Sequence, residues 1–124
     1  MTDFELIGGS SRLEQVLSAF VERVYADPII GFFFVGRDRE RILRHEIAFA
    51  ARHLGGPSEY SGRPLGEVHR PLRINRGQFR RRMAILRTVL GQQEVPIEII
   101  ERWVAAESAL IDVITDTSDC VPDT

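Results

Sequence analysis

The fold is decided by the stretch from His53 to Ile74, which reads HLGGPSEYSGRPLGEVHRPLRI. Its glycine pair, Gly55-Gly56, ends the long helix predicted before it, because glycine readily takes the left-handed backbone conformation that closes a helix. The turn-rich residues that follow predict a loop. A short helical turn is predicted at the end of this loop, and it would place His69 toward the space that the long helix encloses.

Apolar residues recur at helical spacing in the segments on both sides of this loop, and no segment shows the alternation typical of a β-strand. Helix starts are marked by capping residues, whose side chains accept from backbone N–H groups that a helix leaves unpaired. The sequence therefore predicts an all-α fold. The predicted helices are, in chain order, one that opens at the box Ser11-Arg12-Leu13-Glu14, a second over 39–54, a third from the box Asn75-Arg76-Gly77-Gln78 to Gly91, and a fourth from Pro96 with Ile97, Ile100, Val104, Ile111 and Ile114 as its buried stripe.

The second predicted helix has two faces of different chemistry. At about 100° per residue, one arc holds Ile42, His45, Glu46, Phe49 and His53, and the neighbouring arc holds Leu43, Ile47, Ala50 and Leu54. An apolar face beside a face that mixes apolar groups, imidazoles and a carboxylate favours a helix that lies between a protein core and a ligand cavity.

Length and composition predict one ordinary globular domain over residues 1–114, followed by a polar tail over 115–124. The chain is 44% hydrophobic and 27% charged, and its formal net charge of −2 does not favour nucleic acid or an anionic membrane as a partner. The longest apolar run, 29–35, is far below the roughly 20 residues that a spanning helix needs. A single cysteine, Cys120, excludes an internal disulfide, and no leader pattern is seen, so we expect a cytoplasmic protein.

The glycine pair with Pro57, the Tyr60-Ser61-Gly62 triplet and the Val68-His69 step resemble the truncated haemoglobins, closest to their group I pattern. The resemblance covers roughly Phe4 to Ile114. It implies a 2-over-2 helical sandwich around haem b that binds dioxygen, nitric oxide or carbon monoxide at the iron. The resemblance implies oxygen storage and transport as the role. It implies haem, small gases and a reductase as the partners.

The resemblance implies that His69 is the proximal iron ligand, with its second ring nitrogen donating to a backbone carbonyl. A structural histidine is the alternative. The resemblance also implies which residues line the haem site. The implied lining consists of Phe20, Val21, Phe34, Ile42 and Phe49 on the near wall, Leu72, Ile74, Phe79 and Met83 beside the proximal loop, and Arg73, Arg76 and the Tyr60 hydroxyl as partners of the propionates.

One position departs from the family. Many truncated haemoglobins place a tyrosine directly after the phenylalanine that Phe20 matches, and its hydroxyl donates to bound dioxygen. Here that position is Val21, which has no donor. Gas sensing, or nitric-oxide or peroxide chemistry, is therefore favoured over oxygen carriage.

His45 and Glu46 are the candidates for control of the sixth coordination site. Some group I members carry a histidine at the place of His45 that binds iron when no gas is present, whereas others hold a basic residue there that pairs with a propionate. Glu46 stands where the family more often has glutamine or an apolar residue. It either donates to a ligand when protonated, or it pairs with His45 or a nearby arginine.

Two rival functions follow from the same residues. In the first, His45 and Glu46 act as general acid and base of a haem peroxidase, or support nitric-oxide detoxification. In the second, the chain is a haem-free helical adaptor whose face from Arg70 to Arg87 holds an acidic partner. The run Arg80-Arg81-Arg82 is interpreted more simply as a solvated helix face.

Overall fold

The structure is a computed structural model that describes residues 1–57 and 73–115. All regular elements in this part of the chain are helical, which confirms the predicted all-α class. None of these helices is both long and apolar enough to cross a membrane. The elements are α1 (Asp3–Ile7), α2 (Gly9–Ala26), the 3₁₀ turn η1 (Gly31–Phe34), α3 (Arg39–Leu54), α5 (Arg76–Gln92), α6 (Ile97–Ser108) and α7 (Ile111–Ile114).

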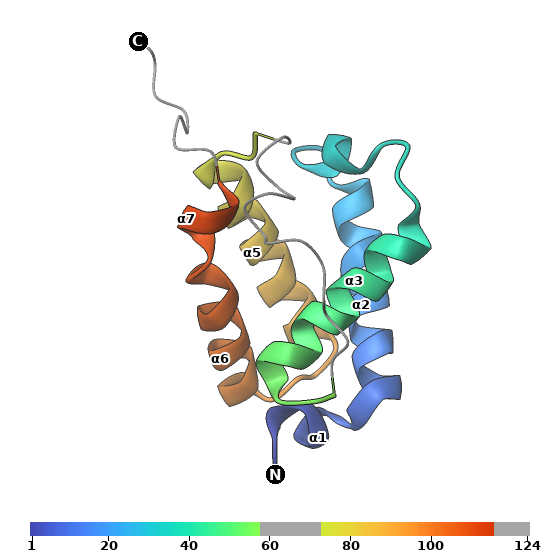
Figure 1. The fold of residues 1–124 in the computed structure, drawn as a ribbon, viewed down its shortest axis with the longest axis vertical. Coiled ribbons are helices and arrows are strands. Elements are labelled where there is room, and N and C mark those ends of the chain that lie inside the picture. The colour runs from blue at the N-terminus through green and yellow to red at the C-terminus, as the bar shows by residue number, and fades with distance from the viewer. Residues whose placement is uncertain (58–72, 116–124) are drawn as a thin grey trace.

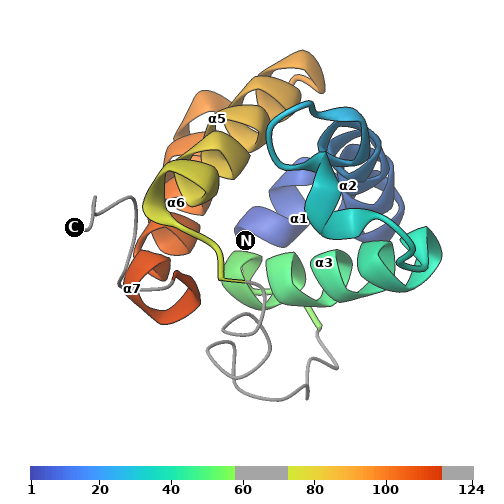
Figure 2. The ribbon, with the colours of Figure 1, turned by 90° about the horizontal axis from the view of Figure 1, so that it is seen from above.

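Two pairs of helices form the 2-over-2 sandwich. In Figure 1, α5 and α6 run side by side in opposite directions, and α3 crosses diagonally in front of α2. Seen from above in Figure 2, α3 closes one side of the space between α2 and the α5–α6 pair. The most extensive contacts join α2 to α3, α5 to α6 and α2 to α5, so α2 connects the two pairs.

The core lies between α2, α5 and α6. Large apolar side chains that are fully buried there remove their surface from water, and each such Leu or Phe stabilises the fold by about 1.5–3 kcal/mol. They include Leu13, Leu17 and Phe20 from α2, Leu86 and Leu90 from α5, and Ile99 and Trp103 from α6.

Two predicted helix boundaries are confirmed. Asn75 and Gln78 form a reciprocal capping box at the start of α5, with bonds of 2.7 Å and 2.9 Å between each side chain and the other residue's N–H. Helix α3 spans the predicted residues and is closed by Gly55, whose φ of 83° lies in the left-handed region that favours glycine.

The predicted start of the first long helix is wrong. The capping box forms at Thr2 and Glu5, where it begins the short helix α1, and not at Ser11 and Glu14. After α1 the chain turns through Gly8, at a φ of 113°, directly into α2. Ser11 therefore lies inside the first turn of α2, and the local capping pattern is overridden by the helix that precedes it.

The C-terminal boundaries also differ from prediction. Gly91 does not end the third helix, because α5 continues to Gln92. The predicted stripe on α6 is wrong in part, since Ile97 is 59% exposed and the buried face is formed by Ile99, Ile100, Trp103 and Glu107. Pro96 caps α6 from outside, and Ile97 then lies about 100° around the helix from the centre of that face.

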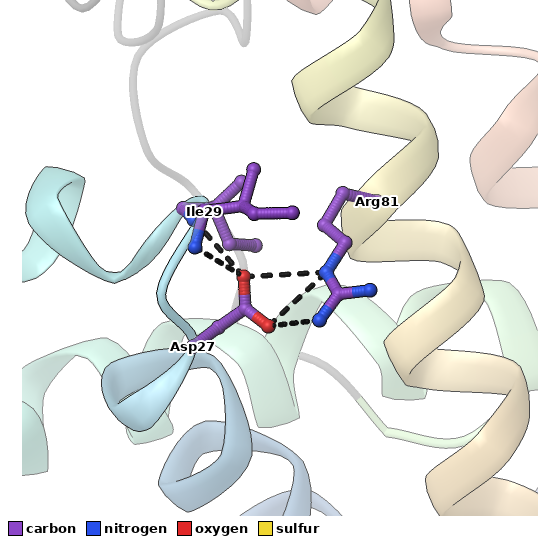
Figure 3. A network of polar contacts seen from close by, with 4 residues as sticks. Asp27, Ile29 and Arg81 are labelled. Atoms are coloured by element: carbon purple, nitrogen blue, oxygen red, sulfur yellow. Dashed lines mark hydrogen bonds and ion pairs between the residues drawn. The ribbon is translucent and has the colours of Figure 1, made fainter.

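A buried carboxylate fixes the corner after α2. Asp27, whose side chain is 5% exposed, accepts from the backbone N–H groups of Ile29 and Ile30 at 3.0 Å each and from Nε of Arg81 on α5 at 3.1 Å (Figure 3). The hydrogen bond from Arg81, with help from the two backbone N–H groups and against the effect of burial, lowers the pKa of Asp27 to about 2. Arg81 is 40% exposed, as the interpretation of a solvated face predicts, but its guanidinium also ties α5 to this corner.

Replacing Asp27 with asparagine keeps an oxygen for the two N–H groups but removes the charge that Arg81 binds. We expect the free energy of unfolding at pH 7 to fall by about 1–2 kcal/mol. Because the folded-state pKa is lowered, the contribution of Asp27 is full above its ordinary pKa of 3.8 and is lost as the pH falls through about 2. Urea unfolding of both proteins should therefore show a smaller difference at pH 3 than at pH 7.

The exposed pair of Arg87 and Glu101 provides the control, since its side chains are 46% and 58% exposed. Glu101→Gln should leave the free energy of unfolding close to that of the wild type, because water and salt screen an exposed pair. Equal losses in the two variants would contradict the assigned role of Asp27.

Candidate functional site

Helix α3 presents the predicted site residues on a face that the described residues cover only in part. Its core side buries Ala50 and Leu54. Ile42, Glu46 and Phe49 on the other side are half-buried, as expected for a helix between a core and a cavity. His45 is exposed, and no residue of 1–57 or 73–115 bonds to its ring.

The other predicted lining residues divide by burial. Those that the protein core covers completely are Phe20, Val21, Phe79 and Met83. Phe34, Ile74 and Arg76 are half-buried, and Arg73 is exposed. The Phe34 ring stacks on Tyr25 with 5.0 Å between centroids, and the Arg76 guanidinium pairs with Asp112.

The predicted loop that carries His69 lies outside the described residues. Tyr60, His69 and Leu72 all lie in the range 58–72, so their assigned roles stay predictions. The polar tail from residue 116 onward lies outside as well. Within the described part of the chain, no three His, Cys, Asp or Glu side chains come together as a metal site.

A buried ionic cluster joins α3, α5 and α6, and sequence reasoning missed its centre. The guanidinium of Arg82 donates to Oε2 of Glu46 at 2.9 Å, to Oε1 of Glu46 at 3.0 Å and to Oε1 of Glu107 at 2.8 Å. The second oxygen of Glu107 accepts from the indole N–H of Trp103 at 2.9 Å. The interpretation of Arg82 as solvated is wrong, because its side chain is only 20% exposed.

Charge and hydrogen bonding explain why three ionic groups tolerate burial. Burial acts to lower the pKa of Arg82, but the charges and hydrogen bonds of Glu46 and Glu107 outweigh it and raise that pKa above its ordinary value. The guanidinium also lies over the Phe20 ring, 4.9 Å from its centroid. We define Glu46, Arg82, Glu107 and Trp103 as the buried cluster.

The sequence did hold a signal for Arg82. At about 100° per residue it lies within about 60° of both Phe79 and Leu86 on α5, and these two residues mark the buried face of that helix. A charge on such a face requires a partner. The partners stand on α3 and α6, and nothing in the local sequence identifies them.

His53 lies beside the cluster, one turn after Phe49. The two rings meet edge to face with 4.4 Å between centroids. Nε2 of His53 is buried and has no hydrogen-bond partner among the described residues. Burial lowers the pKa of His53, and the negative charge of Glu107 opposes this shift. A neutral imidazole is therefore the favoured form in the folded protein.

Comparison with known proteins places these features in one family. Residues 2–114 match the bacterial-like globin family. A group 1 truncated haemoglobin of Mycolicibacterium paratuberculosis is 33% identical over 107 residues, which cover 86% of this chain and 79% of that protein.

Two solved structures share the fold. The Fe(III) form of the truncated haemoglobin from Tetrahymena pyriformis matches with a TM-score of 0.86 and 22% identity, over 93% of this chain and 98% of that one. The 2/2 haemoglobin of a Synechococcus species, solved in the cyanomet state with covalently attached haem, matches with a TM-score of 0.84 and 21% identity, over 92% and 95% of the two chains.

Removing Glu107 from the buried cluster should destabilise the fold more than removing Glu46. Glu107→Gln leaves Arg82 with one carboxylate and deprives the Trp103 N–H of a charged acceptor, so we expect a loss of about 2–3 kcal/mol. Glu46 is 19% exposed, and in Glu46→Gln Arg82 keeps Glu107, so a loss of about 1 kcal/mol is expected. Urea unfolding followed by fluorescence of Trp103, the single tryptophan, measures both values; a reversed order would contradict this ranking.

Proposed function

The chain belongs to the bacterial-like globin family, as a truncated haemoglobin, and from this premise we propose that it binds haem b and a diatomic gas at the haem iron. The observation that carries the proposal is the family match over residues 2–114, which includes the loop with His69. The Synechococcus structure, whose fold this chain shares, contains haem.

The described residues fit such a group. Ile42, Phe49 and Ile74 are apolar side chains that the described residues bury only in part, although each would be more stable if fully covered. A flat, largely apolar macrocycle covers such a surface. Arg73 and Arg76 lie close to Ile74 in the sequence and carry the charge that matches the two carboxylates of haem, although Arg76 already pairs with Asp112.

His69 supplies the axial imidazole in this proposal, and Arg73 and Arg76 bind the propionates. Phe34, Ile42 and Phe49 cover the macrocycle. The iron, when bound, provides the coordination site for carbon monoxide, nitric oxide or dioxygen. Val21 is 1% exposed and offers no hydrogen-bond donor to a gas.

His45 is proposed to occupy the sixth position when no gas is bound. It lies between Ile42 and Phe49 in α3, and its side chain is exposed. Pairing of the same ring with a propionate is the alternative. The two roles differ in the spin state of the iron, so a spectrum can distinguish them.

Loss of the axial ligand should prevent the protein from retaining haem. Purified wild-type protein should show a Soret band, and His69→Ala should lose most of it because the proximal bond is gone and only the bond from His45 on the opposite side remains. Haem content per chain, determined by the pyridine haemochrome assay, is the measurement. His53→Gln, on the far end of α3, should keep its haem; a His69→Ala protein that keeps wild-type haem content would refute the assignment.

Removal of His45 should change the spin state. The ferrous protein without gas should have a low-spin absorption spectrum that becomes high-spin in His45→Ala, because the sixth ligand is then missing. His53→Gln is again the matched control and should stay low-spin. If the wild-type ferrous protein is already high-spin, His45 does not bind the iron and the propionate role is favoured.

A further inference from the structure

The corner after α2 exposes three large apolar side chains. Ile29 is 51% exposed, Phe32 is 58% exposed and Val35 is 80% exposed. All three belong to the run 29–35, which contains no charged residue. The other large apolar side chains that are exposed in the described part of the chain lie in α1, α6 and α7 or at the N-terminus: Met1, Leu6, Ile97 and Val113. Grouped apolar exposure is typical of a binding surface. We define Ile29, Phe32 and Val35 as the corner patch.

The backbone beneath the corner patch is fixed. The Asp27 carboxylate binds two N–H groups of this turn (Figure 3), and the Asp27 carbonyl accepts from the N–H of Gly31 at 2.9 Å. A Cβ atom at Gly31 would lie 2.8 Å from the carbonyl oxygen of Tyr25, so the turn packs directly on the end of α2. The rings of Phe32 and Phe33 also pack together, with 4.1 Å between their centroids. A surface that is ordered before a partner arrives loses less entropy on binding.

Exposed arginines follow the corner patch in the chain: Arg37, Arg39, Arg41 and Arg44. Residues 28–44 contain these four arginines and two acidic residues, so this segment has a net charge of +2, although the whole chain has −2. Nε of Arg37 donates to the carbonyl oxygen of Phe33 at 3.0 Å, and the Arg39 guanidinium lies over the Tyr25 ring, 4.6 Å from its centroid. These two charges therefore lie beside η1, and the other two arginines follow on α3.

The size of the corner patch limits the partners that it fits. A stable protein–protein interface uses about 20–30 residues a side. The corner patch lies at the end of the sandwich remote from α1 (Figure 1), and with the four arginines it comprises only seven residues. A lipid surface requires no matching shape, because apolar side chains enter between the headgroups while arginines bind anionic headgroups. Salt limits electrostatic attraction to about 8 Å at physiological ionic strength, so the local charge decides, and not that of the whole chain.

We propose that the corner patch and its four arginines dock the protein reversibly on the surface of an anionic lipid bilayer. Phe32 and Val35 enter the headgroup region, and the guanidinium groups bind the headgroup phosphates through charge-assisted hydrogen bonds. Because only three apolar side chains are involved, the attachment is weak and reversible. The inference does not depend on haem, since each residue in it lies outside the proposed haem site.

Flotation of the purified full chain with lipid vesicles tests the inference. Vesicles of equal parts phosphatidylglycerol and phosphatidylcholine should bind about tenfold more protein than vesicles of phosphatidylcholine alone, and about 0.5 M salt should remove most of the difference. Replacing Phe32 and Val35 together with serine should weaken binding to the anionic vesicles by about tenfold, because two apolar anchors are lost. Replacing Arg41 and Arg44 together with glutamine should remove the preference for the anionic vesicles.

Matched controls separate docking from a change in the fold. Ile97→Ser changes an apolar side chain of α6 that is 59% exposed, nearly as much as Phe32, and this variant should bind as the wild type does. Arg80→Gln combined with Arg87→Gln removes two exposed charges from α5 and should keep the preference for anionic vesicles. The double serine variant replaces exposed side chains only, so its free energy of unfolding in urea should stay close to that of the wild type.

A lipid monolayer distinguishes insertion from adsorption. Injection beneath a phosphatidylglycerol monolayer should raise its surface pressure with the wild type and not with the double serine variant. A wild type that binds both kinds of vesicle equally, or binds neither, overturns the inference, as does an Ile97→Ser variant that loses as much binding as the double serine variant. A wild type that forms dimers without lipid, and that the serine replacements make monomeric, assigns the corner patch to a second copy and overturns the inference as well.

Discussion

A single guanidinium, that of Arg82, connects three of the four long helices. It extends from α5 to Glu46 on α3 and Glu107 on α6, and the second oxygen of Glu107 binds Trp103 in the core. Burying three charges costs several kcal/mol per ion, and only close geometry with satisfied hydrogen bonds offsets that cost. The helices must therefore keep their present spacing for the cluster to remain favourable. Apolar packing supplies most of the stability, whereas the cluster restricts how α3 can lie on the α5–α6 pair.

Neighbouring arginines on α5 bind partners in different parts of the fold. Arg81 and Arg82 differ by about 100° around the helix, so one side chain reaches Asp27 at the corner after α2 and the other reaches α3 and α6. The Asp27 contact holds the segment that leads into η1 and then α3. Helix α5 thus contacts both the segment that leads toward α3 and the middle of α3 itself, at Glu46. This arrangement leaves the side of α3 with Ile42 and Phe49 covered only in part.

Local signals in the sequence predicted local structure well. Gly55 and the Asn75–Gln78 box mark helix ends through their own backbone and side-chain chemistry, and both appear where expected. The Ser11–Glu14 box failed because another box, at Thr2 and Glu5, starts a helix just before it. Arg82 was misjudged for a related reason. Its partners are separated from it by 36 and 25 residues, and only the tertiary fold brings them together.

The buried cluster also uses up the hydrogen-bond donors of the region beside Phe20. A tyrosine hydroxyl at position 21 would be a donor beside Phe20, but that ring is already covered by the Arg82 guanidinium. The hydrogen-bond donors of this region therefore belong to Arg82, and they bind Glu46 and Glu107. Val21 is 1% exposed and adds no donor to this region. A substitution that freed these N–H groups would leave a buried carboxylate unpaired and so destabilise the fold.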